Sequence, residues 1–198
     1  MRTHCPANER IKREYLTYLK EAQRYSETSI NGVAAAIAHF ERYGKHKDFK
    51  RFRIQQAIGF KKKLAEDVNR KTGRLLSLAT QRSTLNALRS FFIWLAGQPG
   101  YKSRLSYPDA DYFNLSEKDN RIAQSHTPRP FPSLTQARHM ITEMPSATPI
   151  EQRDRALIAF TLMTGCRDRA TVSLKLKHID LANKRVSLDA REVQTKNS

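Results

Sequence analysis

Apolar residues recur with helical spacing in four stretches between residues 8 and 97. The stretches are ERIKREYLTYLKEAQ, NGVAAAIAHFERYG, DFKRFRIQQAIGFKKKLAEDV and SLATQRSTLNALRSFFIWLAG. The first stretch places Ile11, Tyr15, Tyr18 and Leu19 along one face, and the fourth repeats apolar residues at Leu85, Leu88, Phe92 and Leu95. In the third we expect Ile54, Ile58, Leu64 and Val68 to be buried. Residues 1–97 therefore predict a four-helix bundle domain.

The composition and the apolar periodicity of the sequence change after Gly97. Five of the eight prolines fall between Gly97 and Pro132, and apolar periodicity is weak there. Such a stretch is typical of a linker, which we place at residues 98–131 and which a short helix from Ser116 interrupts.

Periodic patterns resume from residue 132. SLTQARHMITEM (133–144) and PIEQRDRALIAFTLMTG (149–165) predict two helices, CRDRATVSLKL (166–176) predicts a third, and IDLANKRVSLDAREVQTKNS alternates like a β-hairpin. Gly165 stands where an apolar helix should stop. Residues 132–198 therefore predict a second, incomplete domain of the α+β type, in a chain that is mainly α.

Charge narrows the class of partner. The formal net charge is +17, with 20 basic and 8 acidic side chains in residues 1–100 and 16 and 11 in residues 101–198. This excess favours a polyanion, and nucleic acid above all. The longest apolar runs are too short to span a bilayer, and no signal peptide opens the chain, so we expect a cytoplasmic protein with no membrane partner.

Other chemistries find little support in the sequence. The two cysteines predict no disulfide framework, the six histidines lack metal-ligand spacing, and no glycine-rich phosphate loop is present, so we expect no metal and no cofactor. Cys166 and His178 could pair as a thiol nucleophile and its base, although no third group is placed to orient them.

Two stretches carry a resemblance to a known family. RDRALIAFTLMTGCRDRATVSLKLKHIDL resembles the first arginine box of the tyrosine recombinases, or phage integrases, and VSLDAREVQTKNS resembles the start of their catalytic hairpin. The resemblance implies a four-helix core-binding (SAM-like) DNA-binding domain at 1–97, a linker, and the N-terminal part of an α+β catalytic domain at 132–198. It also implies cleavage of double-stranded DNA through a 3′-phosphotyrosyl intermediate, with Arg167 and Lys196 as catalytic residues.

A physical hypothesis follows for Arg167. A helix stop at Gly165 would put Arg167 in the first turn of the next helix, where backbone N–H groups favour an anion. Its guanidinium could hold two phosphate oxygens at once, and Lys196 would protonate the leaving oxygen. The alternatives are a solvated arginine after a helix end and a solvated lysine in a turn.

The sequence departs from the family pattern in two ways. Ala170 stands where the family carries an acidic residue, while Asp168 directly follows the arginine. The sequence also contains no His-x-x-Arg box after the hairpin, and all seven tyrosines lie at or before Tyr112. We therefore expect a C-terminally truncated recombinase that does not cut DNA alone, and that would assemble as a homo-oligomer on paired sites only if complete.

The resemblance implies that the second (27–43) and fourth (77–96) helical stretches lie in the major groove. The DNA-binding candidates are Thr28, Asn31, Lys61, Lys62, Lys63, Gln81, Arg82, Asn86 and Arg89. Ordinary solvated side chains are the alternative for each of them. Two other functions stay open: a non-catalytic DNA-binding module or competitor of an intact recombinase, and a basic RNA- or ribosome-associated helical protein.

Overall fold

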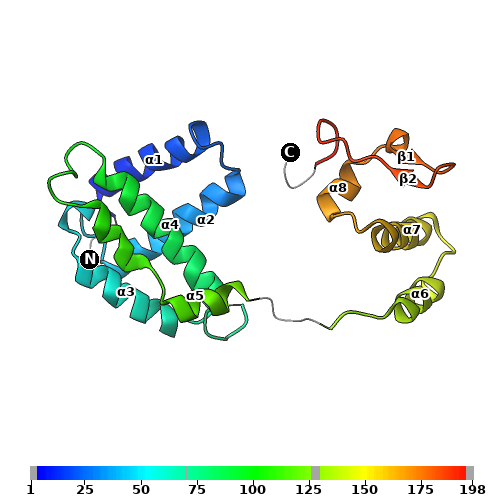
Figure 1. The fold of residues 1–198 in the computed structure, drawn as a ribbon, viewed down its shortest axis with the longest axis horizontal. Helices are drawn as coiled ribbons and strands as arrows, with labels where there is room; N and C mark the ends of the chain where they lie inside the picture. The colour runs from blue at the N-terminus through cyan, green and yellow to red at the C-terminus, as the bar shows by residue number, and fades with distance from the viewer. Residues whose placement is uncertain (1–3, 70, 126–129, 195–198) are drawn as a thin grey trace. The chain divides into compact units, whose positions relative to one another are not determined.

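The computed structural model describes residues 4–69, 71–125 and 130–194. The chain divides into two compact units, the N-terminal unit Met1–Thr127 and the C-terminal unit Pro128–Ser198 (Figure 1). Each is described by itself below.

Four long helices form the frame of the N-terminal unit, as the periodicity predicted. They are α1 (Pro6–Glu21), α2 (Glu27–Tyr43), α3 (Ile54–Glu66) and α4 (Leu78–Ala96), and a short 3-10 turn, η1 (Phe49–Arg51), precedes α3. Serine side chains accept a hydrogen bond from the first turn of α2 (Ser26 from the Ser29 N–H) and of α4 (Ser77 from the Thr80 N–H). These caps fix where both helices begin.

Aromatic side chains dominate the core of the N-terminal unit. The expected stripe of α4 is buried, with Leu85, Leu88, Phe92 and Leu95 all at most 2% exposed. Around Phe92 lie the rings of Phe52, Phe113 and Phe40, with centroids 4.5, 5.0 and 5.5 Å away. Tilted and edge-on aromatic packing of this kind adds to the free energy of burial.

The predicted inner face of α3 is wrong in two places. Ile58 and Val68 are 38% and 52% exposed, while Ala57, Phe60 and Leu64 are fully buried. Residues 57, 60 and 64 share one face of a helix, and the large Phe60 ring packs against Phe40. Burial of that ring turns Ile58 outward.

The structure also differs from the linker expected at residues 98–131. This stretch contains the 3-10 helix η2 (Tyr107–Phe113) and the helix α5 (Glu117–Gln124), and Ser116 caps α5 as expected. The buried residues Tyr101, Leu105, Ala110 and Phe113 belong to the core of the N-terminal unit. Their spacing follows neither an α-helix nor a strand, because a 3-10 helix and irregular turns carry them.

The C-terminal unit contains α6 (Leu134–Glu143), α7 (Pro149–Thr164), the short α8 (Asp168–Ser173) and the turn η3 (Leu176–His178). The expected hairpin is present with two-residue strands, β1 (Ile179–Asp180) and β2 (Arg185–Val186), which pair antiparallel with Ile179 opposite Val186. The third expected helix is shorter than residues 166–176, since the backbone becomes extended at Leu174.

Few apolar side chains of the C-terminal unit are buried. In its described part these are Ala137, Cys166, Ala170 and Val193, whereas Met163, Leu176 and Leu181 are each more than 80% exposed. The apolar helix α7 has no buried residue. None of the helices in the described part of the chain combines the length and the hydrophobicity that a bilayer crossing requires.

Candidate nucleic-acid interface

The junction between α7 and α8 carries the first candidate residue. Gly165 adopts the left-handed conformation (φ 64°, ψ 15°), and its N–H donates to the Thr161 carbonyl at 2.9 Å. Glycine adopts this conformation without the steric cost that a Cβ imposes. The predicted helix stop at Gly165 is therefore confirmed.

Arg167 lies one residue earlier than the hypothesis required. It is the N-cap of α8, with extended backbone (φ −71°, ψ 152°), and Asp168 occupies the first turn in its place. The Arg167 side chain is exposed, and in the described part of the chain no carboxylate lies within 4 Å of its guanidinium. Its charge is therefore available to an external anion.

The first departure from the family pattern, Ala170 with Asp168 directly after the arginine, has a clear place in the structure. The Asp168 carboxylate accepts from the Arg169 N–H at 2.9 Å, so it faces the backbone of its own helix. Ala170 is 5% exposed, and its carbonyl accepts from the Ser173 hydroxyl. The position at which the family has an acidic residue is thus a small packing position here.

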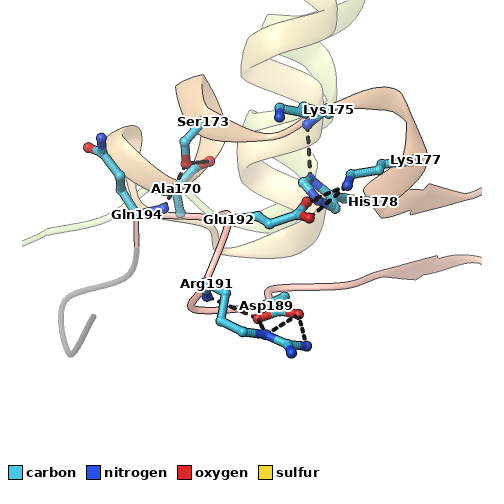
Figure 2. A network of polar contacts seen from close by, with 9 residues as sticks. All are labelled: Ala170, Ser173, Lys175, Lys177, His178, Asp189, Arg191, Glu192 and Gln194. Atoms are coloured by element: carbon cyan, nitrogen blue, oxygen red, sulfur yellow. Dashed lines mark hydrogen bonds and ion pairs between the residues drawn. The ribbon is translucent and has the colours of Figure 1, made fainter.

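A polar network connects the hairpin region to α8 (Figure 2). The Glu192 carboxylate contacts the Lys177 ammonium at 2.6 Å and the His178 Nε2 at 2.7 Å. The Lys177 ammonium, together with His178, lowers the pKa of Glu192. The Gln194 N–H donates to the Ser173 hydroxyl at 2.9 Å. These contacts fix the chain up to Gln194, and the candidate Lys196 lies outside the described residues.

The same network bears on the Cys166 and His178 pair. His178 is 6% exposed, its Nδ1 accepts from the Lys175 N–H at 3.0 Å, and its Nε2 is engaged by Glu192. Both ring nitrogens are therefore occupied, which leaves none for a thiol. In the part that the structure describes, no group of three or more His, Cys, Asp or Glu side chains is placed to hold a metal ion.

The candidates on α2 lie in its first turns. Thr28 and Asn31 are exposed and have no side-chain hydrogen bond within the described part of the chain. Both side chains are therefore accessible to a duplex.

The three consecutive lysines on α3 differ in their burial and in their partners. Lys61 is partly buried and donates to the Asn114 carbonyl at 3.0 Å, and burial lowers its pKa. Lys63 pairs with Asp67 at 3.0 Å, which raises its pKa. Lys62 is exposed, with no ion pair in the described residues. Of the three, Lys62 is the most accessible to a phosphate.

The candidates on α4 do not all face outward. The expected outward placement of Gln81 is wrong, because Gln81 is 7% exposed and its amide donates to the Leu76 carbonyl at 2.9 Å. Arg82 is half-buried, and its Nε has no hydrogen-bond partner among the described residues. Arg89 donates twice to Asp111, at 2.8 and 3.0 Å. Asn86 is exposed and faces solvent, as predicted.

One cluster of cations was missed by the sequence analysis. Lys47, Lys50, Arg51, Arg53 and Arg104 line one basin on the N-terminal unit. The signal was the run KHKDFKRFR at residues 45–53, in which five Lys or Arg side chains are interleaved with two phenylalanines. The contribution of Arg104 could not be seen from sequence spacing.

Comparisons with known proteins agree with the resemblance. The chain is 31% identical to tyrosine recombinase XerC 2 of Ralstonia nicotianae over 108 residues, which cover 54% of this chain and 28% of that protein. It is 26% identical to tyrosine recombinase XerC of Bacillus licheniformis over 176 residues, which cover 84% of this chain and 50% of that protein. No protein-family model and no solved structure matches the chain.

The fold is mainly helical, the chain is strongly basic, and both matched relatives are named tyrosine recombinases. The chain is related to the tyrosine recombinase family. It spans between a quarter and a half of the length of these two relatives.

Proposed function

We propose that this chain is a DNA-binding protein of site-specific recombination, in which the N-terminal unit acts as the core-binding (SAM-like) domain and the C-terminal unit as the N-terminal part of the catalytic domain. The observation that carries the proposal is the relationship to tyrosine recombinases over most of the chain. The net charge of +17 supports it, since duplex DNA is a dense polyanion. The cytoplasm is the matching compartment, and both cysteines in the structure are free.

In this proposal Arg167 holds a phosphate of the strand to be cut. A tyrosine hydroxyl attacks phosphorus and forms the phosphotyrosyl bond, its proton passing to water, while the bond to the 5′ oxygen breaks and that oxygen takes a proton from Lys196. The guanidinium would stabilise the charge that develops on the non-bridging oxygens. The exposed, unpaired side chain of Arg167 supports this role. The attacking tyrosine corresponds to no residue of this sequence.

Salt dependence tests the proposal. We expect the full chain to bind duplex DNA with an association constant that falls steeply with salt, because each neutralised phosphate contributes about 0.9 to the log–log slope. Fluorescence anisotropy with a labelled duplex between 50 and 200 mM salt measures it. Absence of binding at the lowest salt, or a flat slope, would contradict the proposal.

A single substitution tests the phosphate contact of Arg167. Arg167→Ala is expected to reduce the magnitude of the log–log salt slope by about one, the effect of one lost phosphate contact. Arg138→Ala is the matched control, since Arg138 is also exposed and lies on α6 of the same unit without an ion pair in the described residues. Equal slopes for the two variants would remove Arg167 from the interface.

A second candidate function is a DNA-binding module that performs no chemistry, or that competes with an intact recombinase. The basic charge of the chain supports it without requiring strand cleavage. Tyr15 and Tyr101 are buried, and burial raises the pKa of Tyr15 and brings that of Tyr101 to about 12, which disfavours the phenolate. A covalent protein–DNA adduct on a denaturing gel would decide for strand cleavage and against this candidate.

A further inference from the structure

The basin missed by the sequence analysis gathers five cationic side chains of the N-terminal unit. Lys47, Lys50, Arg51, Arg53 and Arg104 line it, and its volume is about 760 Å³. Its other lining residues are Phe52, Gln55 and Gln56, so no carboxylate lines it. All five cationic side chains are exposed.

These cations are not neutralised from within the described part of the chain. No carboxylate there lies within 4 Å of any of the five, in contrast to Lys63 and Arg89, which pair with aspartates. The nearest acidic neighbour along the chain, Asp48, uses its carboxylate to accept from the Lys50 N–H at 2.9 Å. Lys50 also lies over the Tyr101 ring, 5.3 Å from its centroid. The basin therefore presents uncompensated positive charge.

The core holds the basin in shape. Phe49 and Phe52 point inward and are 3% and 9% exposed, which turns their cationic neighbours outward. The fully buried Asn8 side chain accepts from the Phe49 N–H and donates to the Lys47 carbonyl, each at 3.0 Å. A segment fixed in this way loses little conformational entropy when its side chains bind a ligand.

The basin is lined by residues other than the positions that the family resemblance assigned to DNA. Lys47 to Arg53 follow the C-terminal end of α2, and Arg104 follows that of α4, whereas Thr28, Asn31 and Arg82 lie in the N-terminal turns of these helices. Thr28 and Asn31 therefore lie near one end of α2, a helix of 17 residues and about 25 Å, while Lys47 to Arg53 follow its other end.

We propose that this basin is a second DNA-contacting surface, which binds the phosphate backbone of duplex DNA beyond the N-terminal turns of α2 and α4. The inference rests on the proposed DNA-binding function. Three of the five cations are arginines, whose planar guanidinium holds two phosphate oxygens at once. Phe52 is the one apolar lining residue, and it is almost buried, so an acidic protein would find little of the apolar area that protein interfaces use.

The test removes three charges from the basin of the full chain. The variant Arg51→Ala/Arg53→Ala/Arg104→Ala keeps Lys50 on Tyr101 and touches no buried side chain. The matched control is Arg13→Ala/Lys20→Ala/Lys118→Ala, which removes three exposed cations that have no ion pair in the described residues. Circular dichroism and thermal unfolding establish that both variants retain the fold, and anisotropy measures their salt slopes on one duplex.

We expect the slope of the basin variant to fall by about 2.7, which corresponds to three lost phosphate contacts, and that of the control to stay near the wild-type value. Equal slopes for the two variants, with normal binding by the wild type, would overturn this inference and leave the proposed function standing. Absence of DNA binding by the wild type would overturn both. If polyglutamate bound the wild type and lost affinity for the basin variant while duplex binding did not change, the basin would serve an acidic protein instead.

Discussion

Truncation of Phe113 to alanine is expected to destabilise the N-terminal unit by about 3–5 kcal/mol, as large-to-small substitutions of buried aromatic residues do. Phe113 is fully buried, and its ring centroid lies 5.0 Å from that of Phe92 and 5.4 Å from that of Phe40. Alanine leaves a cavity among rings that cannot collapse into it. Since small domains are stable by about 5–15 kcal/mol, this is a large share of the total.

Tyr112 provides an adjacent control. Its side chain is 42% exposed, so Tyr112→Ala is expected to change the free energy of unfolding by no more than about 1 kcal/mol. Urea or thermal unfolding, followed by circular dichroism, gives both values. If Phe113→Ala were as mild as Tyr112→Ala, residues 98–124 would be the linker that their composition suggests, and not part of the core.

The second large effect concerns the two units expressed separately. Fragment 1–127 is expected to unfold cooperatively and to resist limited proteolysis, because it contains the whole aromatic core. Fragment 128–198 is expected to be digested rapidly and to bind a hydrophobic dye, because α7 buries none of its apolar residues and the unit gains little burial to offset the conformational entropy of folding.

Limited proteolysis and dye fluorescence of the two purified fragments check this prediction. The N-terminal fragment is the control, since it has the same source and buffer. A cooperative melting transition for fragment 128–198 would show that its few buried side chains and its hydrogen-bond network suffice for a stable fold. In that case the exposed apolar side chains of α7 would belong to the surface of a stably folded unit.

Helix positions were predictable because their signals are local. Serine caps before α2, α4 and α5, the left-handed Gly165 after α7, and the leucine and phenylalanine stripe of α4 all act within one or two turns of the chain. Such interactions are written into short windows of sequence. The hairpin was also predictable from alternation, although its strands are only two residues long.

The sequence-based predictions were wrong where contacts between residues far apart in the sequence decide which side chains are buried. Prolines and weak periodicity suggested a linker at residues 98–131, but Tyr101 and Phe113 fill space between helices that are far away in sequence. In the same way, Phe60 rather than Ile58 faces Phe40 on α2. Which of two apolar residues on a helix turns inward depends on the partner surface, and a single helix does not contain that information.

The candidate site was only partly predictable for a related reason. Exposure of Thr28, Asn31, Asn86 and Arg167 agrees with the helical pattern. The engagement of Gln81 by the Leu76 carbonyl and of Arg89 by Asp111 depends on loops whose path the pattern does not specify. The basin could have been suspected from the run KHKDFKRFR, but Arg104 joins it only through the fold.

The alternation of inward phenylalanines and outward cations in residues 49–53 separates two kinds of evolutionary constraint. Substitutions at Phe49 and Phe52 would lower the free energy of unfolding, whereas those at Lys50, Arg51 and Arg53 leave the hydrophobic interior unchanged. Under the proposed function, variation at the outward positions would change the affinity for DNA while the thermal stability stays the same. Engineers could adjust affinity in small steps at the same three positions.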